Sequence, residues 1–258
     1  MDPYVVRIVS LAKRAGKTSI GCSLSTWLLK AGVRVAVVKH TVEPIEYEKD
    51  TGRYFRAGAE LVIALSSIAR VSYESRTSPS LKETIASMPS RYKIVLVEGF
   101  KSENEFDCIG VVNNEDEALD LKGSIRRVIA FATLNKELEG RIIDGVRVYG
   151  LNTIGSLGEL VLNKALEYYE SRLPGINCGL CGYSSCREFA QAILGGLDSY
   201  CPVVSDVKLI VNDKELTLTP FVKKALSSMI IGFITSLKGA PKDAGGVESF
   251  RVEFKRGI

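Results

Sequence analysis

The segment Val5–Ser19, with the sequence VVRIVSLAKRAGKTS, decides the fold of this chain. Its first part, Val5–Leu11, is an apolar run with several β-branched residues, which predicts a buried strand. After the loop, apolar side chains recur at helical spacing until Gly32, which supplies the stop. A strand, a loop that ends in Gly-Lys-Thr and a helix are the context that a phosphate-binding loop requires.

Phosphate oxygens are expected to bind at the start of this helix, where backbone N–H groups and the helix dipole offer partial positive charge. The Lys17 side chain would reach the β- and γ-phosphates, and the Thr18 hydroxyl would coordinate Mg²⁺. The candidate phosphate ligands are Ala15, Gly16, Lys17, Thr18 and Ser19. Leu11 replaces the first glycine of the motif G-x4-G-K-[ST], a change that would alter the entry turn or weaken phosphate binding. An ordinary helix that starts after a tight turn is the alternative.

Apolar runs typical of strands continue along the chain. They lie at 33–38, 61–65, 70–73, 92–98, 109–112, 128–132 and 146–149. Their alternation with helical patterns predicts an α/β fold of the P-loop NTPase type, with a mostly parallel, doubly wound sheet. The polar stretch 41–52 between two of these runs has the character of a functional loop.

The run at 92–98 ends in Glu98 and Gly99. In P-loop proteins, a carboxylate at such a strand end orients Mg²⁺ or its water shell. Thr18 and Glu98 are therefore the predicted Mg²⁺ ligands. A surface carboxylate at a strand end is the alternative.

Four cysteines form the second informative motif, with the spacing C-x2-C-x4-C-x14-C. They are Cys178, Cys181, Cys186 and Cys201. A [4Fe–4S] cluster takes one thiolate for each iron, and Pro202 follows the last cysteine as in Cys-Pro cluster motifs. Gly179 and Gly182 let the backbone curl around a bulky inorganic core. A zinc site is the main alternative, although zinc sites usually show two C-x2-C pairs; disulfides or free thiols are the other.

The segment that holds these cysteines also resembles the four-cysteine iron–sulfur domain of some corrinoid and electron-transfer proteins, which begins CGxCGxxxC. The flanking patterns divide the chain into a nucleotide-binding domain at 1–172, an iron–sulfur module at 173–204 and a small α+β element at 205–258. A helix at 156–172, capped by a box of Ser156 and Glu159, closes the first domain. Ser185 and Glu188 cap a helix within the cysteine module. A hairpin around 212–215, a helix at 221–237 and a strand at 247–254 predict a terminal ββαβ element.

Composition narrows the function classes. The chain has 258 residues, a net charge of +4 and 46% hydrophobic residues, which is an ordinary soluble mix. The charge is weak and forms no basic block, so nucleic acid is not an expected partner. The N-terminus lacks signal-peptide architecture, and the apolar stretch 229–237 is too short to span a bilayer, so no membrane association is expected. We therefore expect a cytoplasmic protein, and a reducing cytoplasm agrees with thiols that serve as metal ligands.

Four segments together carry a family resemblance. They are GKTS at 16–19, VVKHT at 37–41, KDTGRYFRAGAELV at 49–62 and VLVEGFK at 95–101. In order and spacing, residues 4–150 resemble the molybdopterin-guanine dinucleotide biosynthesis protein B (MobB) family. The resemblance implies a GTPase-like P-loop fold that binds guanine nucleotide. It also implies a role beside the guanylyltransferase that attaches GMP to molybdopterin, and it leaves a homodimer open.

The resemblance implies further residues of the nucleotide site. They are Lys39 with His40, then Asp50, Thr51 and Arg53, and finally Glu98 with Gly99. It implies that Asp50 helps to hold Mg²⁺ or the γ-phosphate, and that Arg53 contacts a phosphate or a partner. The chain departs from the family at 42–43, where Val-Glu stands in place of histidines, and at 107–112, which lacks a basic residue. The stretch 135–138 reads N-K-E-L, half of a guanine-reading N-K-x-D, because Leu138 replaces the aspartate.

Two functions of different classes remain. In the first, the chain is a GTP- or ATP-binding accessory protein of molybdenum or tungsten cofactor assembly, with Mg²⁺ and a [4Fe–4S] module for redox or docking. Its partner would be the guanylyltransferase or a molybdo- or tungstoenzyme, and any GTP hydrolysis would be slow. In the second, the chain is an iron–sulfur electron-transfer or cluster-carrier protein with a degenerate P-loop, which Leu11 favours and Lys17 opposes. An insertase that uses ATP is a third, weaker option.

Overall fold

The computed structural model describes residues 1–41, 49–75, 80–197, 199–203, 209–211, 214–216 and 218–240. Contacts divide the chain into two compact units. One unit combines Met1–Val38 with Pro89–Ile258, and the other is Lys39–Met88. The boundaries expected at 172 and 204 stay predictions.

A seven-stranded sheet lies at the centre of the first unit, over the residues that the structure describes. Its strands are β1 (Tyr4–Val9), β2 (Val35–Lys39), β5 (Ile94–Glu98), β6 (Asp107–Val111), β7 (Val128–Ala132), β8 (Ile142–Ile143) and β9 (Val146–Tyr149). The order is β2-β5-β1-β6-β7-β9-β8. Strand β1 pairs in parallel with β5 and β6, and β7 continues the parallel run to β9, whereas β8 is antiparallel to β9. The predicted α/β class and the mostly parallel sheet are confirmed.

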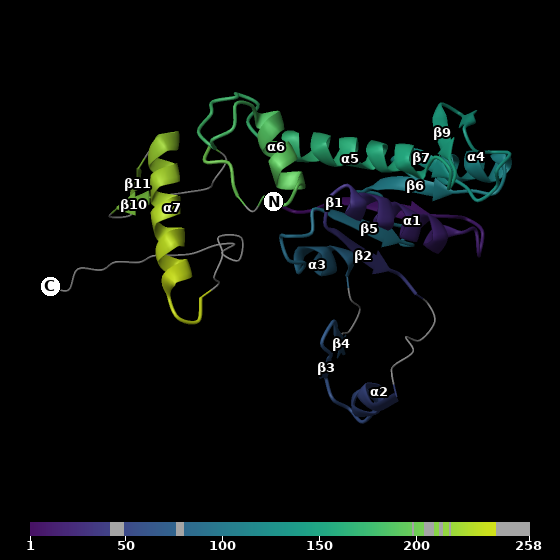
Figure 1. The fold of residues 1–258 in the computed structure, drawn as a ribbon, viewed down its shortest axis with the longest axis horizontal. Helices are drawn as coiled ribbons and strands as arrows, with labels where there is room; N and C mark the ends of the chain where they lie inside the picture. Colours follow the sequence, from purple (N-terminus) through teal and green to yellow (C-terminus); the bar gives the residue numbers. More distant parts are fainter. Residues whose placement is uncertain are drawn as a thin grey trace. The chain divides into compact units, whose positions relative to one another are not determined.

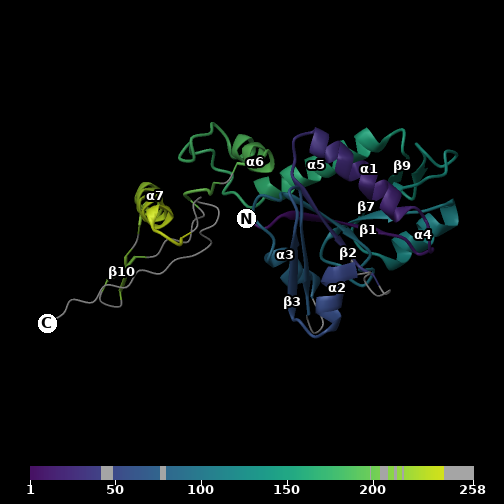
Figure 2. The same ribbon diagram turned by 60° about the horizontal axis from the view of Figure 1, so that its bottom comes forward.

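Helices cover both faces of this sheet (Figure 2). Helices α1 (Lys17–Lys30) and α5 (Ile154–Glu170) pack on the face to which Val6 and Ile8 contribute. Helix α4 (Glu115–Ser124) packs on the opposite face with Val9 and Phe131. Alternate residues of one strand thus enter two separate cores, which explains why the strands are mostly apolar on both faces.

Trp27 of α1 lies directly on two glycines of α5, Gly155 and Gly158. A Cβ added at Gly158 would fall well inside van der Waals contact of Trp27 Cε3, and one at Gly155 would lie 3.2 Å from Trp27 Nε1. The indole ring therefore occupies the space that a side chain on α5 would need. This close approach joins the helix that follows the phosphate loop to the helix that leads into the cysteine module.

We expect Gly158→Ala to lower the free energy of unfolding by about 1–3 kcal/mol, because the new methyl group overpacks the Trp27 contact. Urea denaturation of the full chain measures the change. The matched control is Gly123→Ala in α4, where nothing lies within 4 Å of the added Cβ. This control gains about 1 kcal/mol from helix propensity alone. Equal stability of the two variants would show that Trp27 does not constrain α5.

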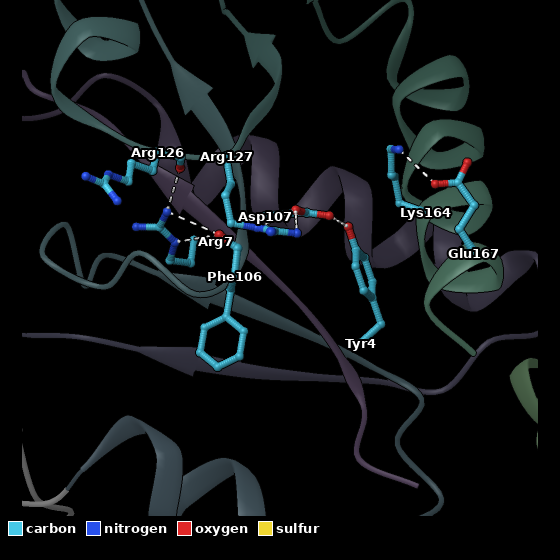
Figure 3. Close-up of polar contacts among 8 residues, drawn as sticks. All are labelled: Tyr4, Arg7, Phe106, Asp107, Arg126, Arg127, Lys164 and Glu167. Atoms are coloured by element: carbon cyan, nitrogen blue, oxygen red, sulfur yellow. Dashed lines mark hydrogen bonds and ion pairs between the residues drawn. The ribbon is translucent and has the colours of Figure 1, made fainter. Parts of the chain in front are cut away.

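A buried polar network fixes the edge of the sheet at which β1, β6 and β7 begin (Figure 3). The Tyr4 hydroxyl donates to Asp107 Oδ2 at 2.8 Å, and Arg127 donates to Asp107 Oδ1 at 2.7 and 3.0 Å. Burial, and then the neighbouring Asp107 carboxylate, raise the pKa of Tyr4 far above its usual value. Arg7 is fully buried and holds the same edge through backbone oxygens. Its acceptors are the carbonyls of Phe100, Phe106 and Arg126. Because these strands are parallel, their opposite edge carries the phosphate loop.

The second unit contains helix α2 (Lys49–Arg56), strands β3 (Leu61–Leu65) and β4 (Arg70–Glu74), and helix α3 (Leu81–Ala86). The strands predicted at 61–65 and 70–73 are confirmed, but they form an antiparallel hairpin of their own and are not part of the mostly parallel sheet. The irregular loop predicted up to residue 52 is also corrected, because α2 already begins at Lys49. Phe55 of α2 contacts Tyr73 with ring centroids 6.2 Å apart, and this contact supports the helix. Residues 42–48 lie outside the described residues.

Helix α6 (Cys186–Leu194) packs at the C-terminal end of α5 (Figure 1). An ion pair of 2.9 Å between Arg187 and Glu170 joins the two helices. The predicted cap of α6 is confirmed, because Ser185 Oγ accepts from the Glu188 N–H at 3.1 Å. The predicted capping box of α5 is wrong: Thr153 is the N-cap, and Ser156 lies inside the helix. The Thr153 hydroxyl makes no cap bond because it donates to Glu139 instead.

The C-terminal region contains strands β10 (Leu209–Val211) and β11 (Lys214–Leu216), which pair as the predicted hairpin. Helix α7 (Pro220–Ser236) follows, one residue earlier than expected. The strand predicted at 247–254 lies outside the described residues. Among the residues described, no helix combines the length and the apolar character needed to cross a membrane.

Candidate functional site

The phosphate loop opens into a pocket of about 250 Å³ at the start of α1. Its lining residues are Arg14, Ala15, Gly16, Lys17, Thr18, Ser19 and Glu98. Gly16 is the N-cap of α1 with φ 93°, and no side chain caps the helix. The backbone angle of Gly16 favours glycine, and a Cβ there would also displace the exposed Leu134 side chain, whose Cδ1 would lie 2.5 Å away. The pocket thus faces a helix start that carries no acidic residue in its first turn.

Lys17 projects back across the loop toward the end of β1. Its ammonium donates to Ser10 Oγ at 2.7 Å, and Ser10 Oγ donates to the Ala12 carbonyl at 2.7 Å. The hydroxyl of Ser10 therefore connects the lysine to the backbone of the loop. This arrangement keeps a positive charge at the pocket wall, where phosphate oxygens would bind.

Thr18 and Glu98 meet although they are 80 residues apart in the sequence. The Thr18 hydroxyl lies 2.9 and 3.0 Å from the two carboxylate oxygens of Glu98. The parallel register that places Ile8 opposite Glu98 causes this meeting, because β1 leads into the loop and β5 ends beside it. A hydroxyl and a carboxylate are the oxygen ligands that Mg²⁺ takes, so the pair fits the predicted ion in chemistry.

Leu11 stands where the motif usually has glycine, and Lys101, from the loop after β5, holds its backbone. Lys101 Nζ donates to the Leu11 carbonyl at 3.2 Å, and the Leu11 side chain is exposed. The Gly99 N–H donates to the Ile8 carbonyl at 3.1 Å and joins the residue after β5 to strand β1. The sequence motif VEGFK contains Lys101, yet sequence reasoning assigned it no role. Its position at the loop became visible only from the fold.

The N-K-E-L segment follows β7 and lies beside the loop, since Leu134 is close to Gly16. Asn135 Nδ2 donates to the Asn113 carbonyl, and Asn135 Oδ1 accepts from the Glu137 N–H. Leu138 is buried in the core on the α4 side of the sheet. The fourth position of the motif therefore supplies core packing and no carboxylate.

The remaining predicted nucleotide residues belong to the unit Lys39–Met88. Lys39 ends β2 and His40 follows it, while Asp50, Thr51 and Arg53 lie on α2. Arg53 is in the last turn of that helix and is exposed. Their roles at the phosphates stay predictions.

The four cysteines of the second motif differ in exposure. Cys178 is exposed, Cys181 is half-buried, and Cys186 and Cys201 are buried. The two buried thiols belong to the core that α5 and α6 share with the central sheet. Cys186 begins α6, and its N–H donates to Asn177 Oδ1 at 2.8 Å, which brings the start of the motif to the start of the helix.

The four thiols are the ligands that a cluster needs, but the structure, which describes all four, does not bring them together around one point. All six cysteines are free of disulfides, so four thiols are available within one small module. Gly179 and Gly182 have φ values of 72° and 90° with nothing near their Cβ positions, as expected for backbone that curls around a cluster. Across the described residues, however, no three His, Cys, Asp or Glu side chains are grouped closely enough to hold a metal ion.

The two other cysteines do not compete for this role. Cys108 is buried in β6, and this burial raises the pKa of its thiol to about 11 against the smaller opposing effect of Arg7. It therefore stays protonated at neutral pH, and a protonated thiol is a poor metal ligand. Cys22 is exposed on α1, in the helix that starts at the phosphate loop.

Comparisons with known proteins agree with both motifs. Residues 5–134 match the family described as "Molybdopterin guanine dinucleotide synthesis protein B", and residues 173–203 match a family described as "Putative Fe-S cluster". A Methanocaldococcus jannaschii protein named "Putative molybdopterin-guanine dinucleotide biosynthesis adapter protein" is 30% identical over 240 residues, which cover 88% of this chain and 89% of that protein. The relative thus extends through the cysteine module as well as the sheet.

Solved structures show the same fold at low identity. The crystal structure of Bacillus subtilis MobB is 19% identical and has a TM-score of 0.51, with 63% of this chain and 97% of that chain covered. A crystal structure of molybdopterin-guanine biosynthesis protein B is 23% identical and has a TM-score of 0.50, with 62% and 99% covered. The matched family model, the relative and the shared fold together show that this chain belongs to the MobB family.

Proposed function

We propose that this chain is a GTP-binding adapter in the synthesis of molybdopterin guanine dinucleotide, with a [4Fe–4S] cluster in its cysteine module. The observation that carries the nucleotide part is the pocket at the start of α1, where Lys17, Thr18 and Glu98 line one cavity. The family and the name of the relative from Methanocaldococcus jannaschii support the biosynthetic context. The chain would act beside the guanylyltransferase that uses GTP, or beside an enzyme that receives the finished cofactor.

In this proposal the loop binds the polyphosphate of GTP. The N–H groups of the first turn of α1 donate to phosphate oxygens, and the Lys17 ammonium moves from Ser10 to the phosphates or bridges both. Thr18 and Glu98 hold Mg²⁺, which neutralises phosphate charge when it is bound. The two side chains already lie within 3.0 Å of each other, so little rearrangement precedes binding of the ion.

The preference for guanine rests on Asn135 and on the family. Asn135 is fixed by two hydrogen bonds beside the loop, where its neighbour Leu134 reaches Gly16. Because Leu138 is buried and apolar, the carboxylate that would accept from the guanine N1–H and amino groups is missing from this position. Discrimination between GTP and ATP is therefore expected to be modest.

The cluster would be held by Cys178, Cys181, Cys186 and Cys201. When bound, it supplies one-electron chemistry or a rigid docking element. Cys186 and Cys201 are anchored in the core, whereas Cys178 and Cys181 lie on the glycine-containing turn that precedes α6. The turn would close over the cluster while α6 stays in place.

Calorimetric titration of the anaerobically purified full chain with GTP and ATP tests this proposal. We expect micromolar binding of GTP in the presence of Mg²⁺, with an ATP affinity lower by less than about tenfold, since a neutral hydrogen bond from Asn135 to guanine is worth at most about 1.4 kcal/mol. Absence of binding to either nucleotide, with a reducible cluster retained, would instead support an electron-transfer or cluster-carrier protein with a degenerate loop.

A further inference from the structure

Arg14 occupies an unusual backbone position in the phosphate loop. Its φ is 57°, in the left-handed region that glycine adopts without strain. A non-glycine residue held in this conformation stores strain, and such strain clusters at ligand-binding sites. Arg14 also lines the pocket together with Gly16, Lys17 and Thr18.

The guanidinium group of Arg14 has no hydrogen bond or ion pair to any residue that the structure describes, and the side chain is exposed. The other two cations at the loop are engaged: Lys17 donates to Ser10, and Lys101 donates to the Leu11 carbonyl. Arg14, a lining residue of the pocket, therefore carries five side-chain N–H donors that no described residue satisfies.

The charge of the pocket depends on this residue. Two cations, Arg14 and Lys17, and one carboxylate, Glu98, line the cavity. Without Arg14, the carboxylate would balance the charge of Lys17, and the lining would carry no net charge toward an anionic ligand. The neighbouring Lys13 is exposed as well, but it does not line the pocket.

We propose that Arg14 is a second cationic contact for the polyphosphate of the bound nucleotide. The inference rests on the proposed nucleotide binding and deepens it. A guanidinium group binds phosphate oxygens through parallel N–H···O bonds, which suits a loop that lacks its first glycine. Arg14 would thus offset the weaker backbone cradle that Leu11 causes.

Three variants of the full chain separate charge from backbone effects. Arg14→Asn removes the charge with a residue that tolerates a positive φ. Arg14→Lys keeps the charge but loses the planar fork. Lys13→Asn is the matched control, because it removes the same charge from the adjacent exposed residue. Thermal melting of each variant checks that the fold is retained.

The ligands are GTP, GMP and inorganic tripolyphosphate, each measured by calorimetry. We expect Arg14→Asn to raise the Kd for GTP about tenfold or more, because a charge-assisted hydrogen bond is lost. Tripolyphosphate should lose affinity by a similar factor and GMP by less. Arg14→Lys should restore part of the affinity, and Lys13→Asn should change it less than about twofold, as expected for a screened surface charge.

Equal effects of Arg14→Asn and Lys13→Asn on GTP would overturn the inference while leaving nucleotide binding in place. A loss for GTP without a loss for tripolyphosphate would also overturn it, because Arg14 would then contact the base or ribose. If the unmodified chain binds neither GTP nor ATP, the proposed function fails, and this inference fails with it.

Discussion

Lys17→Ala should lower the affinity of the full chain for GTP by at least about 100-fold, since two charge-assisted hydrogen bonds to phosphate are worth about 3 kcal/mol or more. The ammonium lies at the pocket wall, already oriented by its 2.7 Å bond to Ser10. Arg14 also lines the pocket, but Lys17 is the cation at the start of α1, and Lys101 is turned toward the Leu11 carbonyl. Calorimetry with GTP and Mg²⁺ measures the change.

Lys30→Ala is the matched control for this experiment. Lys30 is the last residue of the same helix, so the substitution removes the same charge from the end that faces away from the phosphate loop. It should leave the GTP affinity within about twofold, because a distant exposed charge is screened by salt. If Lys17→Ala bound GTP as tightly as this control, the loop would not be a phosphate site.

The central sheet was predictable from the sequence because its strands are buried on both faces. The runs 94–97 and 128–132 are apolar without interruption, and the structure places the strands Ile94–Glu98 and Val128–Ala132 there. Glu98 was identifiable for the same reason, since it is the first charged residue after a buried run. Parallel pairing of β1 and β5 then places Glu98 beside Thr18. A sequence motif suggests this neighbourhood, but only the register of the two strands shows it.

Elements that depend on contacts far apart in the sequence were not predictable. Ser156 and Glu159 form a good local capping signal, but the helix begins earlier, after Thr153, whose hydroxyl bonds to Glu139 and does not cap the helix. Helix α2 was missed because its sequence is polar, and its Phe55 packs on Tyr73 of β4, which lies 18 residues further along the chain. Local patterns cannot report such partners.

In the candidate site, too, the sequence motif identified some residues and the fold was needed to identify others. The motif identifies Lys17 and Thr18, but it assigns no role to Arg14, whose importance follows from an unusual φ and a position in the pocket wall. Lys101 is likewise ordinary in the sequence and becomes relevant through its bond to the Leu11 carbonyl. Lys101 bonds to the backbone at Leu11, where the loop departs from its motif, and Arg14 stands at a position that the motif leaves variable.

A continuous core connects the two candidate centres. Helix α1 starts at the phosphate loop, Trp27 of α1 packs on Gly158 of α5, and α5 packs on α6, which begins with Cys186. A change in the cysteine module therefore acts on helices that pack on the helix of the phosphate loop. For this reason, stability and nucleotide affinity must both be measured when the cysteines are replaced.

Single alanine substitutions in the four-cysteine motif should abolish the cluster. After anaerobic reconstitution, we expect about four iron atoms per chain in the unmodified protein and close to none in Cys178→Ala or Cys186→Ala, since each iron needs its own thiolate. Iron analysis and the visible absorbance of the cluster measure the loss. Cys22→Ala is the control, because Cys22 lies on α1, outside the motif, and should leave the iron content unchanged.

The free energy of unfolding of the iron-free variants should distinguish the buried cysteines of the motif from the more exposed ones. Cys186 is buried in the core shared by α5 and α6, so Cys186→Ala should cost about 1 kcal/mol through the lost packing of its sulfur. Cys178 is exposed, so Cys178→Ala should change the iron-free stability by less than about 0.5 kcal/mol. A colourless protein with one zinc per chain would show a zinc site. Iron retained in both variants would show that these thiols are not its ligands. Loss of iron in both variants, with loss of stability in only one, would mean that two thiols are fixed by the fold and two are brought in by the cluster.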